Sequence, residues 1–251
     1  MRAFEEQAAA QYNEELAADL EQFSPRLAAV LKREGLRSLV VFGRERAAAH
    51  GFSMRGNVRC FIELMVCVGS SFDLDHQLPW AARILGDRSI TCQMARAERL
   101  YDAALIYLDE VHGPDNEYSI SALRRLNEVL SVGEDQLRRL SSLDPFEAVK
   151  LMYPQKAAYI GEQAASESIQ LGQSLAARYS APTAMGAALC TGLVLGFGSG
   201  VFSDPAYPWI LGALTHPQLT TPDQRMERLL QRVRTYSNAM LLHLTQDPAS
   251  A

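Results

Sequence analysis

The sequence predicts an all-α protein made of two tandem homologous helical repeats with a helical insert between them. Two observations lead to this prediction. Apolar residues recur at helical spacing along most of the chain, and Ala and Leu, both strong helix formers, are abundant. The chain also aligns with itself without a gap when it is shifted by 129 residues. Each repeat is expected to hold about five helices, and the two repeats are expected to pack on each other.

The 129-residue shift aligns the stretch from Pro25 to Tyr107 with a second stretch that starts at Pro154. It pairs residue types that are chosen for backbone geometry, including the only two tryptophans of the chain. The main pairs are Gly43 with Gly172, Gly69-Ser70 with Gly198-Ser199, Asp75 with Asp204, Pro79-Trp80 with Pro208-Trp209, Arg96 with Arg225, and Tyr107 with Tyr236. A gap-free alignment of this length is typical of a duplicated backbone.

The repeats set the expected domain bounds. These are an N-terminal amphipathic helix (1–24), repeat one (25–113), a helical insert (114–150), repeat two (151–244) and a disordered tail (245–251). Within repeat one, Glu34-Gly35 is expected to break the chain between two helices, and Pro79 is expected to start a short helix. The insert is predicted to hold short helices at 119–130 and 134–140, followed by one that Asp144 caps.

The first helix carries an apolar stripe between acidic residues and has a face to spare for a partner. Because a helix can dock in a partner's groove through such a stripe, we expect Phe4, Tyr12 and Leu16 to bind a protein. Arg124 and Arg125 of the insert are expected to face the same kind of partner.

Charge and composition argue against nucleic acid and membrane partners. The net charge is -5, and no basic stripe is present to neutralise phosphates. The apolar stretches 56–69 and 184–202 are predicted to be buried core helices and not membrane spans. The acidic N-terminus does not resemble a signal peptide, and the four cysteines form no CxxC pair. We therefore expect buried, reduced thiols and a cytoplasmic location.

No sequence motif of a nucleotide-binding loop, metalloprotease or serine hydrolase is present, so no catalytic residue and no cofactor are predicted. Asp73, Asp75 and His76 could be metal ligands. The second repeat keeps only Asp204 of these, which favours a structural role, so no metal is predicted either. The aspartates Asp75 and Asp204 are instead expected to cap the short helix that follows them.

The repeated arginines also have a functional and a structural interpretation. Arg96 and Arg225 could form an anion-binding site, but an ion pair to the aspartate-bearing loop of the same repeat is favoured, since both repeats carry it. The predicted structural clasp therefore comprises the aspartates, tryptophans and arginines of both repeats. Its members are Asp75, Trp80, Arg96, Asp204, Trp209 and Arg225.

Five short segments together resemble a small helical family found in type VI secretion loci. They are Gly51-Phe-Ser, Phe61-Ile-Glu-Leu-Met65, Gly69-x-x-Phe72-Asp73, Pro79-Trp80-Ala81 and Arg96-x-Glu-Arg-Leu100-Tyr101. The family lies near VgrG spikes, PAAR tips, toxic effectors and the adaptor chaperones that load them. The resemblance covers about residues 25–111, and 154–242 through the internal repeat. It implies an accessory role as a chaperone or co-chaperone, and it carries over no catalytic residue.

Three functions remain open. The first is a cytoplasmic accessory protein that binds an effector or its adaptor before secretion. The second is an immunity protein, whose negative net charge would suit a basic toxin. The third is an enzyme, which would need a polar, solvent-open pocket lined by the repeated Asp, Arg and Trp residues.

Overall fold

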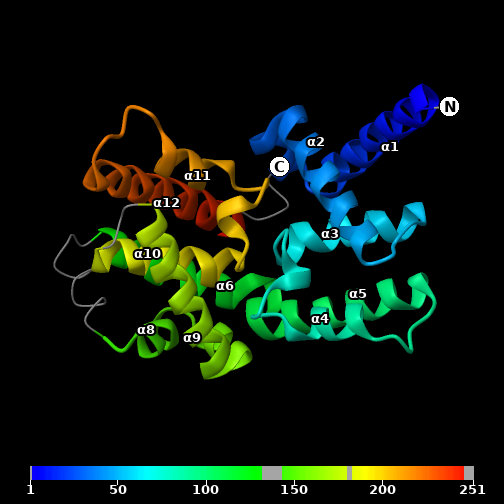
Figure 1. Cartoon of the computed structure of the whole chain (residues 1–251). Coiled ribbons are helices and arrows are strands. Elements are labelled where there is room, and N and C mark those ends of the chain that lie inside the picture. Colours follow the sequence, from blue (N-terminus) through cyan, green and yellow to red (C-terminus); the bar gives the residue numbers. More distant parts are fainter. Residues whose placement is uncertain (1, 132–142, 180–182, 246–251) are drawn as a thin grey trace.

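The computed structural model describes residues 2–131, 143–179 and 183–245, and within these ranges the chain is helical with no strand. The all-α prediction is therefore confirmed. Figure 1 shows two groups of helices side by side, with α6 running between them. The predicted helix at 134–140 and the tail at 246–251 lie outside the described residues.

The first group of helices is formed by residues 2–112. Its elements are α1 (Arg2–Phe23), α2 (Pro25–Ala49), α3 (Arg55–Val68), η1 (Phe72–Leu74), α4 (Pro79–Gly86) and α5 (Gln93–His112). Two elements then lead to the second group, η2 (Pro114–Asn116) and α6 (Glu117–Ser131). The second group comprises α8 (Pro145–Met152), α9 (Pro154–Arg178), α10 (Ala184–Phe197), η3 (Val201–Ser203), α11 (Pro208–Thr215) and α12 (Pro222–Thr245).

Several elements of the two groups have bounds that differ by the same 129 residues. This holds at both ends for α2 and α9, for α3 and α10, for η1 and η3, and for α4 and α11, and at the first residue for α5 and α12. Backbone irregularities follow the same spacing. Lys32 interrupts α2 with φ 59° and ψ 178°, and Gly161 interrupts α9 with φ 73° and ψ 175°.

The predicted break between two helices is present as a kink, but it lies at Lys32 and not at Glu34-Gly35. The irregular residue is Lys32, and helical structure resumes directly after it. Gly35 lies within the helix, where a Cβ atom would come 2.9 Å from the Cβ of Leu31. The glycine therefore permits tight packing inside the helix and does not end it.

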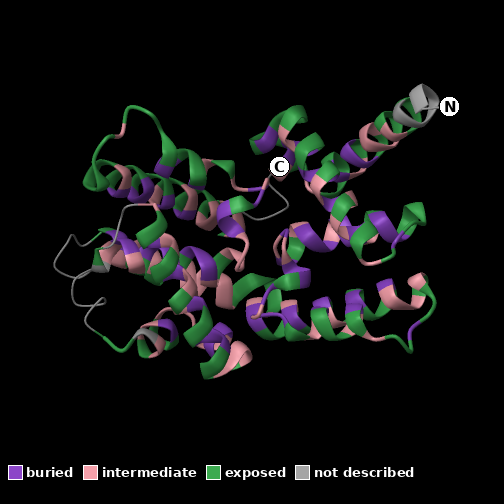
Figure 2. Ribbon diagram, viewed as in Figure 1, coloured by how far each residue is buried: buried purple, intermediate pink, exposed green. Residues whose placement is uncertain are grey.

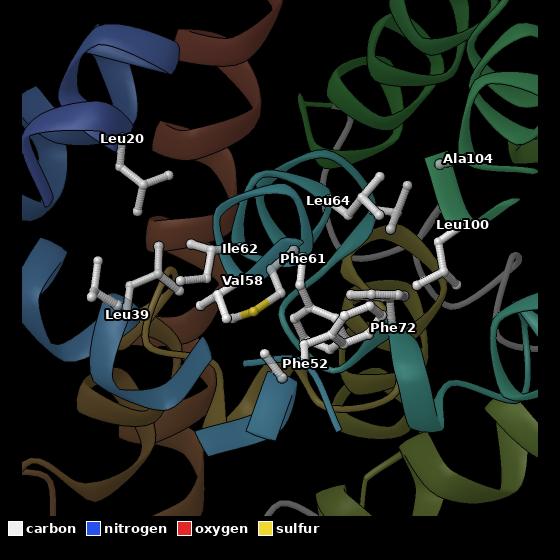
Figure 3. Close-up of a cluster of buried hydrophobic side chains, with 14 of the residues drawn as sticks. Leu20, Leu39, Phe52, Val58, Phe61, Ile62, Leu64, Phe72, Leu100 and Ala104 are labelled. Carbon is white, nitrogen blue, oxygen red and sulfur yellow. The ribbon is translucent and has the colours of Figure 1, made fainter. Parts of the chain in front are cut away.

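Each group of helices has its own hydrophobic core, and buried and exposed residues alternate along the helices (Figure 2). In the first core, Phe61 of α3 packs between Phe52 and Phe72, with ring centroids 5.8 and 4.8 Å away (Figure 3). The second core is built mainly from α10, α11 and α12, with Val194 and Leu229 fully buried. Burial of such side chains, at about 25 cal/mol per Å² of apolar surface, is the main force that holds each group together.

The apolar face of α1 is occupied by its own chain. Leu16 and Leu20 are buried against the first core, and the ring of Tyr12 lies beneath the guanidinium groups of Arg44 and Arg55. The prediction that α1 has a face to spare is therefore wrong for Tyr12 and Leu16. The side chain of Phe4 lies outside the described part of the structure.

Two further predictions concern burial. No described helix has the length and apolar character needed to cross a membrane. All four cysteines are free thiols, as expected, but only Cys190 is buried. Cys67 is exposed and Cys60 is half-buried because α3, which contains both, also has an outer face, and Cys92 is exposed in the loop before α5.

Candidate functional site

Two loops, one from each group of helices, meet at the centre of the molecule and exchange hydrogen bonds. Asp75 of the first loop accepts a hydrogen bond from the backbone N–H of Ser199, with Oδ2 2.9 Å from the nitrogen. Asp204 of the second loop accepts one from the N–H of Ser70 at 3.2 Å and one from the Ser70 hydroxyl at 2.6 Å. Each aspartate thus binds the Gly-Ser segment of the other group of helices. We call this contact between the two loops the junction.

The same aspartates also hold their own loops. Asp75 Oδ1 accepts from the N–H of Gln77 at 2.9 Å, and Asp204 Oδ1 accepts from the N–H of Ala206 at 2.8 Å. Neither aspartate caps the short helix that follows, because the capping positions are Leu78 and Tyr207. The predicted cap is therefore wrong. The aspartates lie three residues too early in the chain, where they close a turn and reach across the junction.

Repeated glycines let the two loops approach closely. A Cβ atom on Gly69 would lie 3.0 Å from the carbonyl oxygen of Phe197, and one on Gly198 would lie 2.7 Å from Asp75 Oδ2. Both glycines have positive φ, 106° and 98°, and end helices α3 and α10. The Gly-rich segment 196–200 therefore serves helix termination and close packing, as its sequence context indicates. Burial raises the pKa of Asp204, and the hydrogen bonds from Ser70 and Ala206 oppose that rise.

The repeated arginines have a different role from the one predicted. Arg96 donates to the backbone carbonyls of His50 and Ile90, at 2.9 and 2.7 Å, and Arg225 donates to that of Leu219 at 3.1 Å. Neither arginine forms the predicted ion pair with Asp75 or Asp204, because backbone carbonyls occupy its guanidinium: those of Ile90 and Leu219 lie in the loops before α5 and α12, and that of His50 lies at the end of α2. The arginines therefore fix the chain leading into α5 and α12.

The repeated tryptophans are half-buried at the edges of the two cores. Trp80 stacks on Phe72 at 6.4 Å between ring centroids, and Trp209 stacks on Tyr236 at 5.4 Å. The six residues of the predicted clasp are thus divided in space. Of these six, Asp75 and Asp204 form the reciprocal hydrogen bonds between the two groups of helices.

A buried ionic cluster lies beside the first loop, at positions whose counterparts 129 residues later are apolar or aromatic. Asp73, whose side chain has no exposed surface, pairs with Arg46, and its Oδ2 lies 2.6 Å from His50 Nε2. We call these three residues the Asp73 cluster. The residues 129 positions later are Leu175, Tyr179 and Phe202, and there the rings of Tyr179 and Phe202 stack at 5.7 Å. Three coordinated replacements thus exchange an ionic contact for an aromatic one.

A second polar group lies between α5 and α9. The ammonium of Lys156 is buried, donates to the hydroxyl of Tyr107 at 2.5 Å and lies 4.9 Å from the centre of that ring. Burial lowers the pKa of Lys156 to about 8, while the nearby carboxylate of Asp75 opposes the shift. Burial, with the nearby charge of Lys156, lowers the pKa of His112 to about 4. The internal alignment does not predict a buried charge at Lys156, because the residue 129 positions earlier is Leu27.

An open groove lies between α3 and α5. Its walls are formed by one turn of α3 and the adjacent face of α5, with residues Asn57, Cys60, Met94, Ala97, Glu98, Tyr101 and Asp102. Met94, Tyr101 and Leu105, three residues on one face of α5, have about half of their surface exposed (52, 51 and 47%). We call these three the α5 stripe. The groove was not predicted from the sequence, although the members of the α5 stripe are 7 and 4 residues apart, which is a helical spacing.

A wider cleft lies between α6 and α12, and Arg124 is one of the residues that line it. Arg124 and Arg125 are both exposed, as a role in binding would require. The repeated aspartates and tryptophans line neither of these two clefts. In the described ranges no three His, Cys, Asp or Glu side chains lie close enough together to hold a metal ion.

Comparison with the known protein families, with curated proteins and with solved structures gives no match.

We predict that Lys156 makes stability depend on pH in the alkaline range. Because its pKa is lowered in the fold, the unfolded chain binds the proton more tightly between pH 8 and 10.5. The free energy of unfolding contributed by Lys156 therefore rises from pH 8 to 10.5, on the order of 3 kcal/mol in all. Relative to Lys156→Met, the unaltered protein should gain stability across this window in urea unfolding experiments. Lys150→Met, at an exposed lysine, should show no such difference, and parallel curves for Lys156→Met would contradict the prediction.

Proposed function

We propose that the chain consists of two copies of one helical unit, and that shared positions maintain the fold while unshared positions carry function. The equal spacing of helix bounds, the matched irregularities at Lys32 and Gly161 and the reciprocal hydrogen bonds of Asp75 and Asp204 support the duplication. An insertion or deletion in only one half of the chain would have shifted these features relative to one another. The last part of α1 and helix α8 extend the correspondence, since Leu20 and Val149 are both buried at equivalent positions.

The Asp73 cluster tests this duplication. Asp73→Phe alone introduces the residue of the second repeat beside Arg46 and His50, and should lower the free energy of unfolding by about 2–4 kcal/mol by removing the partner of a largely buried charge. Adding Arg46→Leu and His50→Tyr completes the arrangement of the second repeat and should restore most of that loss. Urea unfolding measures both variants. If the triple variant is no more stable than Asp73→Phe, the two sites are not structurally equivalent.

We further propose that the protein is an accessory factor that binds another protein, in type VI secretion an effector or the adaptor that loads it. One observation supports the binding role, namely the α5 stripe. Its three large apolar side chains lie on one helical face and are each half exposed, and two of them, Met94 and Tyr101, line a groove; such a surface is typical of one that a partner covers. The resemblance of segments around Phe61, Pro79 and Arg96 to a family of type VI secretion loci supports the choice of partner.

Co-expression with the effector and adaptor encoded beside this gene, followed by size-exclusion chromatography, tests the proposal. We expect co-elution with one of them, and loss of co-elution in Tyr101→Glu, which places a charge on the apolar surface. Ile106→Glu is the matched control, because Ile106 is also exposed on α5 and lies outside the residues that line the groove. Failure of the unaltered protein to co-elute with any neighbour would reject the accessory role.

The alternative is an immunity protein that neutralises a toxic effector. The net charge of -5 and the carboxylates of Glu98 and Asp102 beside the α5 stripe favour a basic partner in either case. The two roles differ in the cell. An immunity protein rescues cells that express the toxin, whereas an accessory protein increases the amount of stable or secreted effector.

A further inference from the structure

The second group of helices contains a covered counterpart of the open groove. On α12, Leu230 and Arg234 lie 129 residues after Tyr101 and Leu105 of α5. Leu230 is only 9% exposed, and it belongs to a buried cluster with Leu130 of α6. Tyr101, at the equivalent position, is 51% exposed. The same helical face is thus closed in one half of the molecule and open in the other.

Helix α6 closes the face of α12 through a stripe on its C-terminal half. Leu130 is buried, and Leu126 and Val129 pack against the same core. Two hydrogen bonds hold α6 on α12. Arg234 donates to the carbonyl of Leu130 at 2.6 Å, and Ser237 donates to Asn127 Oδ1 at 2.5 Å. The molecule therefore shows what kind of element fits such a face. It is an amphipathic helix with apolar residues at positions i, i+3 and i+4.

Near α5, helix α6 reaches only the far end of the equivalent face. The contact is at the C-terminus of α5, where His112 Nδ1 lies 2.6 Å from the hydroxyl of Ser119. The face from Met94 to Leu105, which spans about 16 Å along the helix at 1.5 Å per residue, keeps its large side chains exposed. This length matches about three turns of a second helix.

The side chains of the open face determine the charge of a fitting occupant. Where α12 has Asp223 and Arg234, α5 has Met94 and Leu105, so the open stripe is more apolar than its counterpart. The charged residues that line the groove are Glu98 and Asp102, both acidic. A helix with Lys or Arg beside its apolar stripe would complement this surface.

We propose that the groove between α3 and α5 binds a basic amphipathic helix of a partner protein, seated on Tyr101 and Leu105 as α6 is seated on α12. The inference rests on the proposed protein-binding function and specifies the partner's contact element. Apolar residues of the helix cover Cys60 and the α5 stripe, and its basic residues lie beside Glu98 and Asp102. This is helix-in-groove recognition, for which the apolar stripe supplies affinity and the charges supply orientation.

Three synthetic peptides of about 14 residues, or about four turns, test the proposal with the full-length protein. The first combines Leu and Val at the spacing of Leu126, Val129 and Leu130 with flanking lysines. The second replaces the lysines with glutamates, and the third replaces the apolar stripe with serines. Fluorescence anisotropy should show binding of the first peptide, with the other two weaker by about tenfold or more. Tyr101→Glu should weaken the first peptide by about tenfold or more, and Ile106→Glu by less than about twofold.

Native cysteines report where the peptide binds. Cys60 lines the groove, whereas the exposed Cys92 precedes α5 and is not part of it. The first peptide should slow alkylation of Cys60 and leave that of Cys92 unchanged. Absence of binding, equal binding of the acidic peptide, or binding that is indifferent to Tyr101→Glu would overturn the proposal.

The peptide experiment and the co-elution experiment fail independently. If a partner co-elutes in a Tyr101-dependent manner but no basic peptide binds, the protein-binding function stands and the helical occupant is wrong. If the basic peptide binds and protects Cys60 but no neighbour co-elutes, the groove is a helix-binding site and the accessory role in secretion is wrong.

Discussion

The arrangement of the two groups of helices depends on the exchange of hydrogen bonds between Asp75 and Ser199 and between Asp204 and Ser70. Both carboxylates are buried, so each must have its partners supplied by protein. Removing either carboxylate while the junction stays closed would leave a buried N–H or hydroxyl donor unpaired, at about 1–3 kcal/mol for each donor. The exchange therefore holds the ends of α3 and α10 against each other, and hydrogen bonds from Gln77 to Val194 and from Lys156 to Tyr107 add to the contact between the two groups.

This constraint explains why some residues recur 129 positions later in the chain and others are free to differ. Gly69, Ser70 and Asp75 need their exact chemistry, because each one contacts the corresponding loop of the other repeat. Positions away from the junction carry no such requirement. There the repeats differ in the Asp73 cluster and in the buried Lys156, and above all in the helix that covers α12 and leaves α5 open.

Helix positions were predictable from the sequence because their signals are local. Proline at the first helical position marks the start of α2, α4, α9 and α11, and Asp144 caps α8 as expected, with its carboxylate accepting from Phe146 and Glu147. An apolar stripe also predicts that a helix face is covered. It does not say by what, which is why Leu16, buried in the chain's own core, was predicted to bind a partner.

The junction itself could not be predicted, for a physical reason connected with the repeat. Since both groups of helices carry the same Gly-Ser and Asp residues, a hydrogen bond within one group and a hydrogen bond between the groups satisfy the same atoms, and the sequence does not distinguish them. The arginines show the same ambiguity. Arg96 has carbonyl acceptors at His50 and Ile90 that no side-chain pattern reveals. The open groove, by contrast, is marked in the sequence by the helical spacing of Met94, Tyr101 and Leu105. That this face is open to a partner becomes clear only from the structure, where α6 covers the equivalent face of α12.

Native-state hydrogen exchange tests the exchanged contacts most directly, because the backbone amides of Ser70 and Ser199 are donors in them. If the two loops hold the molecule together, both amides exchange only on global unfolding, with the same protection as the core amide of Leu100. In Asp204→Ala, the Ser70 amide should lose far more protection than the core does. Fast exchange of Ser70 and Ser199 in the unaltered protein, while Leu100 remains protected, would contradict the central role of this junction.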